Sequence, residues 1–301
     1  MRIIYLFLVF LFGLNFYGLP SSAKKLTGAI VSSGVQRTFV YNVPFNSRAN
    51  LPLVIAFHGA KGDGEHMAGL SQFDPLSERE NFIVVYPDGI NKEWNDGRLL
   101  GDAKAKDVQF TLDLIRYFET NFRINTNKVY AVGMSNGALF SYRLACEIPN
   151  KIAGIGVVAG SMNLNLASHC SPSKPVPVIA FNGTEDTFIP YKGGNIVAKR
   201  GRVIPVEQAI GFWAKVNHCL LPPIKQKVAV PTPKDRTGII STIYRGGSHR
   251  VVLYTIINGG HTWPGGTPYL PERIVGATTK HINASKLIWE FFERNTREAI
   301  E

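Results

Sequence analysis

Five residues near the middle of the chain, Gly133-Met-Ser-Asn-Gly137, have the spacing G-x-S-x-G. A serine hydroxyl is a weak nucleophile, and it becomes reactive where a sharp turn holds it exposed beside a base. Small residues on both sides of the serine allow the close chain approach that this turn requires. The apolar run 129–134 precedes the motif and a helical pattern follows it, which is the expected context. We therefore expect Ser135 to be a catalytic nucleophile.

A nucleophile of this kind requires an acid and then a histidine later in the chain, each in a loop after a strand. Among the acidic residues between Ser135 and His261, only Glu185 and Asp186 directly follow a predicted strand. We expect Asp186 to be the acid, with Glu185 as the alternative, because a carboxylate there would orient the imidazole. His261 lies in the glycine-rich segment 258–266, directly after a predicted strand. No other of the seven histidines combines this order with this setting, so His261 is the expected base.

An oxyanion hole needs two backbone N–H groups that point at the oxygen on which negative charge develops. Asn136 directly follows the nucleophile and is expected to supply the first N–H group. The second should come from the loop after the early strand 53–57. In that loop Ala60 is the expected donor, and Gly59 is the alternative.

Two tryptophans lie close in sequence to these candidates. Trp263 comes two residues after the expected base, and Trp94 lies in the loop after the strand 82–86. Aromatic side chains at the mouth of a site offer flat apolar area to a ring or a polymer chain. Trp263 and Trp94 are therefore candidates for substrate contact, with packing in the core as the alternative.

The elements that would position these residues alternate along the chain. Seven short runs rich in β-branched and aromatic residues are predicted strands: 37–43, 53–57, 82–86, 129–134, 155–159, 176–181 and 251–257. Helical patterns occupy 107–122, 137–146, 205–216 and 282–293. Most of the strands lack polar alternation, which indicates burial on both faces of a mostly parallel sheet. The sequence thus predicts a three-layer α/β sandwich. The proline-rich segment 222–238 is expected to be an irregular surface loop.

The first 23 residues have the layout of a signal peptide, with Arg2, an apolar run at 3–14 and small residues ending at Ala23. That run is shorter than the roughly 20 residues that a membrane-spanning helix needs. We expect cleavage after Ala23, no stable membrane anchor afterwards, and a secreted or periplasmic protein. Residues 24–301 are then long enough to form a single α/β domain.

The formal net charge is +11, from 33 Lys and Arg against 22 Asp and Glu. These residues are spread along the chain without a long basic run or a nucleic-acid-binding motif, so we expect a solvated basic surface and no nucleic-acid partner. Three cysteines, Cys146, Cys170 and Cys219, predict one disulfide and one leftover thiol in an oxidising compartment. Their count alone does not choose the pair.

Taken together, the motifs resemble the secreted polyhydroxybutyrate depolymerase and feruloyl esterase family of the α/β-hydrolase superfamily. The resemblance rests on segments in order along the chain: His58-Gly59, Gly133–Ala138, Tyr142–Glu147, Asn182–Asp186, Ile189–Tyr191 and Gly260–Gly265. It implies an α/β-hydrolase fold and places the family's nucleophile, acid and base on Ser135, Asp186 and His261.

Two positions depart from the pattern of that family. The family usually has glycine where this chain has Gln109, so we expect different packing beneath the site. The family also tends to pair a cysteine resembling Cys219 with one near Gly247 or Ser248, and this chain has none there. The resemblance therefore implies a free Cys219 and a disulfide between Cys146 and Cys170.

The expected activity is hydrolysis of a carboxylic ester through an acyl-enzyme, with no metal or organic cofactor. The resemblance favours a polymeric or oligomeric substrate, a hydroxyalkanoate polyester or its oligomers, with feruloyl or acetylxylan esters as the alternative. A non-catalytic polymer-binding protein and a serine peptidase are further hypotheses, because the fold alone does not determine function.

Overall fold

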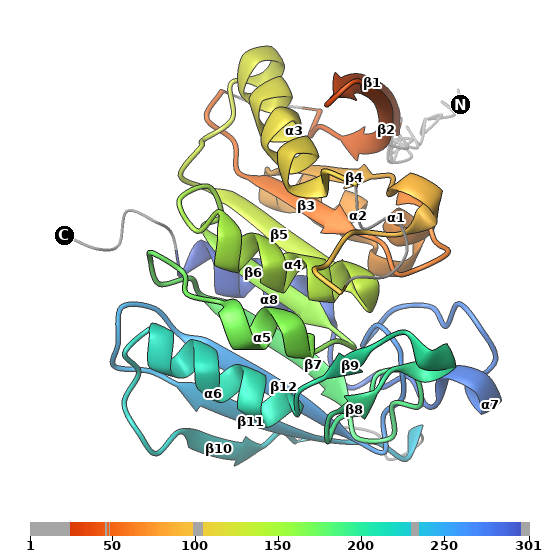
Figure 1. Cartoon of the computed structure of the whole chain (residues 1–301), viewed down its shortest axis with the longest axis vertical. Coiled ribbons are helices and arrows are strands. Elements are labelled where there is room, and N and C mark those ends of the chain that lie inside the picture. Colours follow the sequence, from red (N-terminus) through yellow and green to blue (C-terminus); the bar gives the residue numbers. More distant parts are fainter. Residues whose placement is uncertain (1–24, 46, 48, 99–104, 230–234, 296–301) are drawn as a thin grey trace, which may run out of the picture.

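The computed structural model describes residues 25–295 except 46, 48, 99–104 and 230–234, so the expected signal peptide lies outside the described residues. A ten-stranded sheet runs through the molecule (Figure 1). In spatial order its strands are β1 (Leu26–Ser32), β2 (Val35–Asn42), β4 (Ile83–Pro87), β3 (Leu53–Phe57), β5 (Val129–Met134), β6 (Gly154–Val158), β7 (Val178–Gly183), β12 (Val251–Ile257), β11 (Gly238–Tyr244) and β10 (Ile224–Lys227). The strands from β4 to β12 are parallel, and the outer strands are antiparallel.

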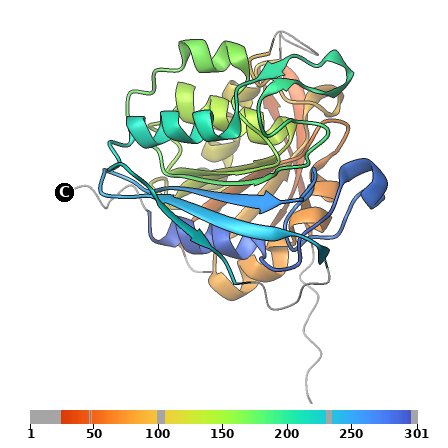
Figure 2. The same ribbon diagram turned by 90° about the horizontal axis from the view of Figure 1, so that it is seen from below.

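Helices cover both faces of this sheet (Figure 2). They are α1 (Gly64–Ser71), α2 (Phe73–Glu80), α3 (Asp107–Phe122), α4 (Asn136–Glu147), α5 (Leu164–His169), α6 (Val206–Val216), α7 (Glu272–Val275) and α8 (Ala284–Glu293). Two 3-10 turns, η1 (Ile90–Lys92) and η2 (Val197–Lys199), and a small hairpin of β8 (Gly194–Asn195) and β9 (Arg202–Val203) complete the described elements.

The burial of the central strands explains the three layers. Every residue of β3, β4, β5, β6 and β7 is buried, so each of these strands needs apolar cover on both faces. One core contains side chains of α3, α4 and α6, and a second contains side chains of α1, α2 and α8. The predicted α/β sandwich with a mostly parallel sheet is therefore confirmed.

The prediction for the segment 222–238 is wrong in part, because residues Ile224–Lys227 form the edge strand β10. This strand is short and mostly exposed, and among the described strands it pairs only with β11. Its sequence, Ile-Lys-Gln-Lys, carries no apolar pattern that would mark a strand. Within the described residues, no helix combines the length and apolarity needed to cross a membrane.

Candidate active site

Ser135 occupies the sharp turn between β5 and α4. Its backbone has φ 55° and ψ −120°, a conformation that is strained for a residue other than glycine. A Cβ added to Gly133 would lie 2.2 Å from the carbonyl of Gly137, and one added to Gly137 would lie 2.2 Å from the carbonyl oxygen of Phe57. Both glycines of the motif are thus required by close packing. The N–H of Ser135 donates to Val158 at 3.0 Å, which ties the turn to β6.

Asp186 and His261 form a buried pair. The Nδ1 atom of His261 lies 2.7 Å from Oδ2 of Asp186, and both side chains are 2% exposed. The other carboxylate oxygen, Oδ1, accepts the N–H groups of Phe188 and Ile189, each at 2.8 Å. With Nδ1 donating to the carboxylate, Nε2 of the imidazole is left as an acceptor. Glu185, the alternative acid, is exposed.

All three candidate residues follow the carboxyl ends of parallel strands. Ser135 comes after β5, Asp186 after β7 and His261 after β12, so they share one edge of the sheet, where ligands bind in open α/β folds. The loops after β7 and β12 are joined by a hydrogen bond from the N–H of Glu185 to Gly259 at 2.9 Å. The sheet thus brings the expected nucleophile, acid and base to one edge.

Two aromatic side chains flank this pair. The ring of Phe188 lies 5.0 Å from the imidazole of His261, centroid to centroid. Burial, together with the negative charge of Asp186, raises the pKa of Tyr269 above its ordinary value. Tyr269 nevertheless remains 43% exposed.

The expected oxyanion donors come from the residue after Ser135 and from the loop after β3. Asn136 is the first residue of α4, where backbone N–H groups have no partner within the helix. A Cβ on Gly59 would lie 3.3 Å from the Cβ of Ser135, so Gly59 packs closely beside the nucleophile. The structure therefore places Gly59, the residue before Ala60, close to Ser135.

The expectation that two tryptophans contact substrate is wrong, because both are buried. Trp263 is 1% exposed, and its Nε1 donates to Ser285 at 3.0 Å. Trp94 is 3% exposed and stacks on Phe140 at a centroid distance of 5.4 Å. Their closeness to the site in sequence was compatible with either role, and packing in the core is the role that the structure gives them.

Sequence reasoning missed a buried polar network next to the loop that follows β3. The side chain of Asn136 accepts the N–H of Trp94 at 2.7 Å and donates to Oδ2 of Asp96 at 2.7 Å. The carboxylate of Asp96 also pairs with Arg98 at 2.6 Å. This network fixes the segment after η1 against the first turn of α4. It joins residues about forty positions apart in the chain, so no local sequence pattern marks it.

A second buried ion pair supports the same segment. Arg37 lies 2.9 Å from Oδ1 of Asp107, and the two side chains are 4% and 0% exposed. Oδ2 of Asp107 accepts the N–H of Asn95 at 2.8 Å. Gln109, expected to alter the packing beneath the site, is exposed on α3 and donates to Asp113 at 2.9 Å, so that expectation is wrong.

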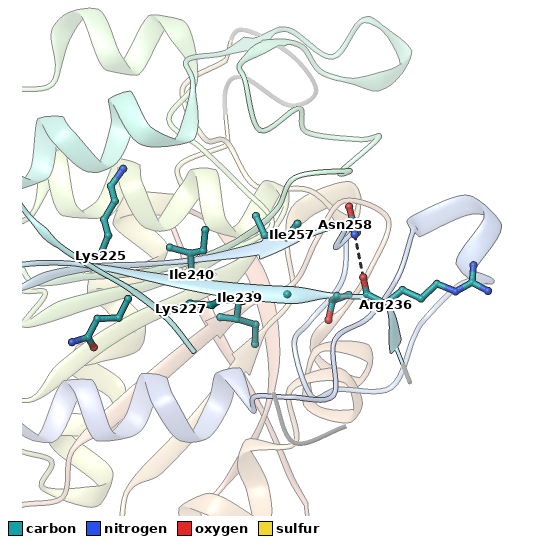
Figure 3. Close-up of a pocket in the computed structure, with 10 residues that line it drawn as sticks. Lys225, Lys227, Arg236, Ile239, Ile240, Ile257 and Asn258 are labelled. Carbon is teal, nitrogen blue, oxygen red and sulfur yellow. Dashed lines mark hydrogen bonds between the residues drawn. The ribbon is translucent and has the colours of Figure 1, made fainter. Parts of the chain in front are cut away.

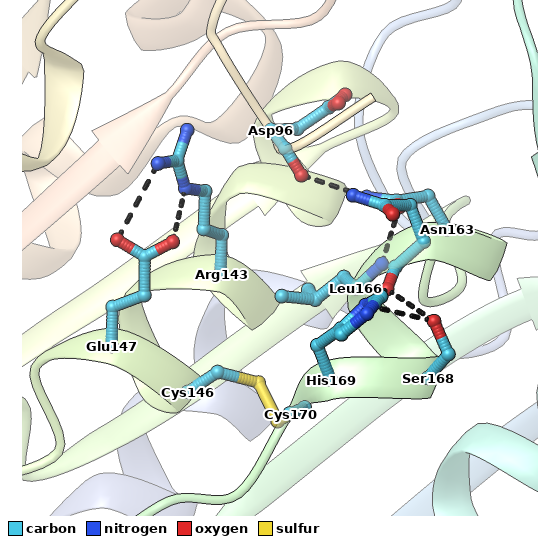
Figure 4. The surroundings of a disulfide bond; sticks show 10 residues. Asp96, Arg143, Cys146, Glu147, Asn163, Leu166, Ser168, His169 and Cys170 are labelled. Atoms are coloured by element: carbon cyan, nitrogen blue, oxygen red, sulfur yellow. Dashed lines mark hydrogen bonds and ion pairs between the residues drawn. A yellow bond between two sulfur atoms is a disulfide. The ribbon is translucent and has the colours of Figure 1, made fainter. Parts of the chain in front are cut away.

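The predicted disulfide between Cys146 and Cys170 is present, with Cα atoms 5.4 Å apart (Figure 4). It fastens the end of α5 to the last turn of α4. At the start of α5, the cap residue Asn163 donates to the backbone carbonyl of Asp96 at 2.7 Å. The disulfide is therefore connected to the buried network through α5. Cys219 is free as expected, and burial raises the pKa of its thiol.

An open groove of about 610 Å³ lies along β10, β11 and the end of β12 (Figure 3). Its lining includes the cationic residues Lys225, Lys227 and Arg236 and the apolar residues Ile240 and Ile257. The groove-lining residues do not include the expected nucleophile, acid or base, so this groove is separate from the candidate active site.

Comparisons with known proteins agree with this geometry. Residues 38–174 match the family described as Esterase PHB depolymerase. Feruloyl esterase B of Piromyces equi is 30% identical over 219 residues, which cover 70% of this chain and 39% of that protein. The bifunctional acetylxylan esterase/xylanase XynS20E of Neocallimastix patriciarum is 29% identical over 160 residues, covering 53% of this chain and 23% of that protein. The chain thus spans well under half the length of these two relatives.

Among solved structures, the acetyl xylan esterase from Aspergillus awamori has a TM-score of 0.60 at 18% identity, covering 89% of this chain and 99% of that one. The fold and these matches define a carboxylic ester hydrolase of the α/β-hydrolase class.

Proposed function

We propose that the protein is a serine hydrolase in which Ser135, His261 and Asp186 cleave a carboxylic ester through an acyl-enzyme. The observation that carries this proposal is the buried 2.7 Å contact between His261 and Asp186, on the same sheet edge as the strained turn at Ser135. A carboxylate that holds Nδ1–H leaves Nε2 ready to accept a proton from the serine hydroxyl.

In the first half of the reaction, Oγ of Ser135 forms a bond to the ester carbonyl carbon while its proton moves to Nε2 of His261. The electron pair of the carbonyl moves onto oxygen, where the N–H groups of Asn136 and Ala60 stabilise the charge. Asp186 stabilises the imidazolium. When the tetrahedral intermediate collapses, the bond to the alcohol oxygen breaks and His261 gives that oxygen its proton.

In the second half, water attacks the acyl group on Ser135. His261 accepts a proton from the water and then returns it to Oγ as the carboxylic acid leaves. The chain's own residues therefore supply the nucleophile of the first half, and the proton carrier and oxyanion donors for both halves, while water is the nucleophile of the second half.

The proposed substrate is a hydroxyalkanoate polyester or its oligomers. This choice is supported by the name of the matching family and by exposed apolar side chains near Asp186 and His261, on the segment that ends in α7. They are Tyr269, Leu270 and Ile274, which are 40–43% exposed. That segment reaches the site, because the N–H of His261 donates to the carbonyl of Val275. Feruloyl or acetylxylan esters are the alternative, supported by the names of two relatives.

We also propose that the protein is exported as a single domain of residues 24–301 after removal of residues 1–23. The signal-peptide layout supports export. The disulfide between Cys146 and Cys170 supports it independently, because disulfides persist mainly in oxidising compartments.

A covalent fluorophosphonate probe tests the nucleophile. Wild-type protein should be labelled, and Ser135→Ala should not be, while circular dichroism shows that both are folded. Folded wild-type protein that resists the probe would favour the non-catalytic polymer-binding hypothesis.

A substrate panel tests the reaction class. We expect turnover of hydroxybutyrate oligomers, compared with methyl ferulate and acetylated xylan at equal enzyme concentration. Peptide amides should remain uncleaved, and strong amidase activity would instead indicate a peptidase.

A further inference from the structure

His58 is a buried histidine that lies outside the Ser135–Asp186–His261 set but directly after β3, beside the oxyanion loop. Both of its ring nitrogens are hydrogen-bonded. Nε2 lies 3.0 Å from the N–H of Gly89, and Nδ1 lies 2.7 Å from the carbonyl oxygen of Gly59. A backbone N–H can only donate and a carbonyl can only accept, so the ring proton is on Nδ1. The two contacts thus specify a single neutral tautomer.

The contact with Gly59 has a geometric consequence for Ala60. The carbonyl of Gly59 and the N–H of Ala60 belong to one planar trans peptide, in which the two groups point in opposite directions. The same carbonyl also accepts the N–H of Gly62 at 3.0 Å. Holding the carbonyl toward His58 therefore turns the N–H of Ala60 to the other side of the peptide.

We propose that His58 is a positioning residue, whose Nδ1–H holds the Gly59 carbonyl so that the N–H of Ala60 is aimed at the oxyanion. This inference rests on the proposed acyl transfer at Ser135. A Cβ on Gly59 would lie 3.3 Å from the Cβ of Ser135, so the residue whose carbonyl His58 holds lies close to the nucleophile.

The surroundings of His58 keep its ring fixed and neutral. The side chain of Trp94 packs against the imidazole at a centroid distance of 5.0 Å, and its Nε1 donates to the His58 carbonyl at 3.0 Å. Burial lowers the pKa of His58, although the nearby carboxylates of Asp88 and Asp63 act in the opposite direction. A protonated ring would lose its acceptor for the N–H of Gly89, so the neutral form fits both contacts.

The test compares two amide replacements that each retain one contact. In His58→Asn, the side-chain amide can occupy the position of Nδ1 and donate to Gly59. In His58→Gln, the amide oxygen can reach the position of Nε2 and accept from Gly89, but the donor to Gly59 is lost. His58→Leu removes both contacts.

We expect kcat on a soluble ester to fall about 10²- to 10³-fold in the leucine variant, as for loss of one oxyanion donor, with KM little changed. The asparagine variant should retain a kcat at least about tenfold above that of the glutamine variant, because only asparagine keeps the donor to Gly59. The rate at which a fluorophosphonate phosphonylates Ser135 should rank the His58 variants in the same order as kcat, because that reaction also develops negative charge on oxygen.

His249→Leu is the matched control, because His249 is also buried and its pKa is also lowered by burial. It should lower the midpoint of thermal unfolding while kcat stays near wild type. The inference is overturned if the kcat of His58→Gln equals or exceeds that of His58→Asn. It is also overturned if kcat across the His58 variants simply follows their midpoints of thermal unfolding. The comparison of kcat between His58→Asn and His58→Gln still tests the inference even when His58→Leu does not fold. Retained activity in Ser135→Ala would instead refute the proposed function.

Discussion

The disulfide gives the most quantitative prediction about stability. Cys146 and Cys170 are 24 residues apart in the chain, and the bond closes this segment in the unfolded state as well as the folded state. On the chain-entropy relation, a loop of this length stabilises the folded protein by about 3.5 kcal/mol. The double variant Cys146→Ala/Cys170→Ala should lose about that much free energy of unfolding. For a domain of this size, the midpoint of thermal unfolding should fall by about 7 °C.

Urea unfolding followed by tryptophan fluorescence measures this change. The same shift should follow from adding a reductant to the wild-type protein, whereas the double variant should not respond to the reductant. Cys219→Ala is the control, because it removes a cysteine without opening a loop, and its midpoint should lie much closer to wild type.

Activity separates the stability effect from an effect on the site. Asn163 and Asn165 bind the backbone of the segment after η1 through side-chain hydrogen bonds that do not require the disulfide. We therefore expect kcat at 25 °C to stay near wild type in the double variant. The reasoning is refuted if the double variant unfolds at the wild-type urea concentration, or if a non-reduced digest of the wild-type protein contains both thiols free.

Four further predictions concern the site and the free thiol. Asp186→Asn should lower kcat about 10⁴-fold in an ester assay with little change in KM, because the amide no longer holds the tautomer that His261 needs; unchanged kcat would exclude Asp186 as the acid. Gly137→Ala should fail to fold or lose fluorophosphonate labelling, because its Cβ would lie 2.2 Å from the Phe57 carbonyl oxygen. Tyr269→Ala should raise KM for a hydroxybutyrate oligomer more than for an acetyl ester, whereas Leu221→Ala, which removes another exposed apolar side chain, should change neither. Cys219 should react with iodoacetamide at pH 8 more slowly than a free cysteine peptide, because a raised pKa leaves less thiolate at that pH.

The central fold was predictable because its signals are local. Continuous apolar runs mark β3, β5 and β6, and residues just after such strands share one edge when the strands are parallel. Asp186 and His261 could therefore be paired from their positions alone. The helices α1 and α2 were missed because each spans only eight residues and they are separated by a single residue, Gln72, with φ 54°.

The sequence alone did not predict which side chains are buried or which residues from distant parts of the chain are in contact. Trp94 and Trp263 lie near the site in sequence, but only the packing of Phe140 and Phe73 against them shows that their rings are covered. Likewise, the contact between Asn136 and Asp96 joins two polar residues that would each be expected at the surface. No repeating pattern in a single sequence indicates that two such residues, distant in the chain, are in contact.

The edge strand β10 has a consequence for how the protein behaves at high concentration. One side of this strand pairs with β11, and the other side has no partner strand in the part of the chain that the structure describes. Lys225 and Lys227 are exposed on it, so a second copy adding a strand there would bring like charges together and remove them from water. The short, charged edge therefore opposes growth of the sheet from one molecule into the next and favours a dispersed protein over an aggregated one.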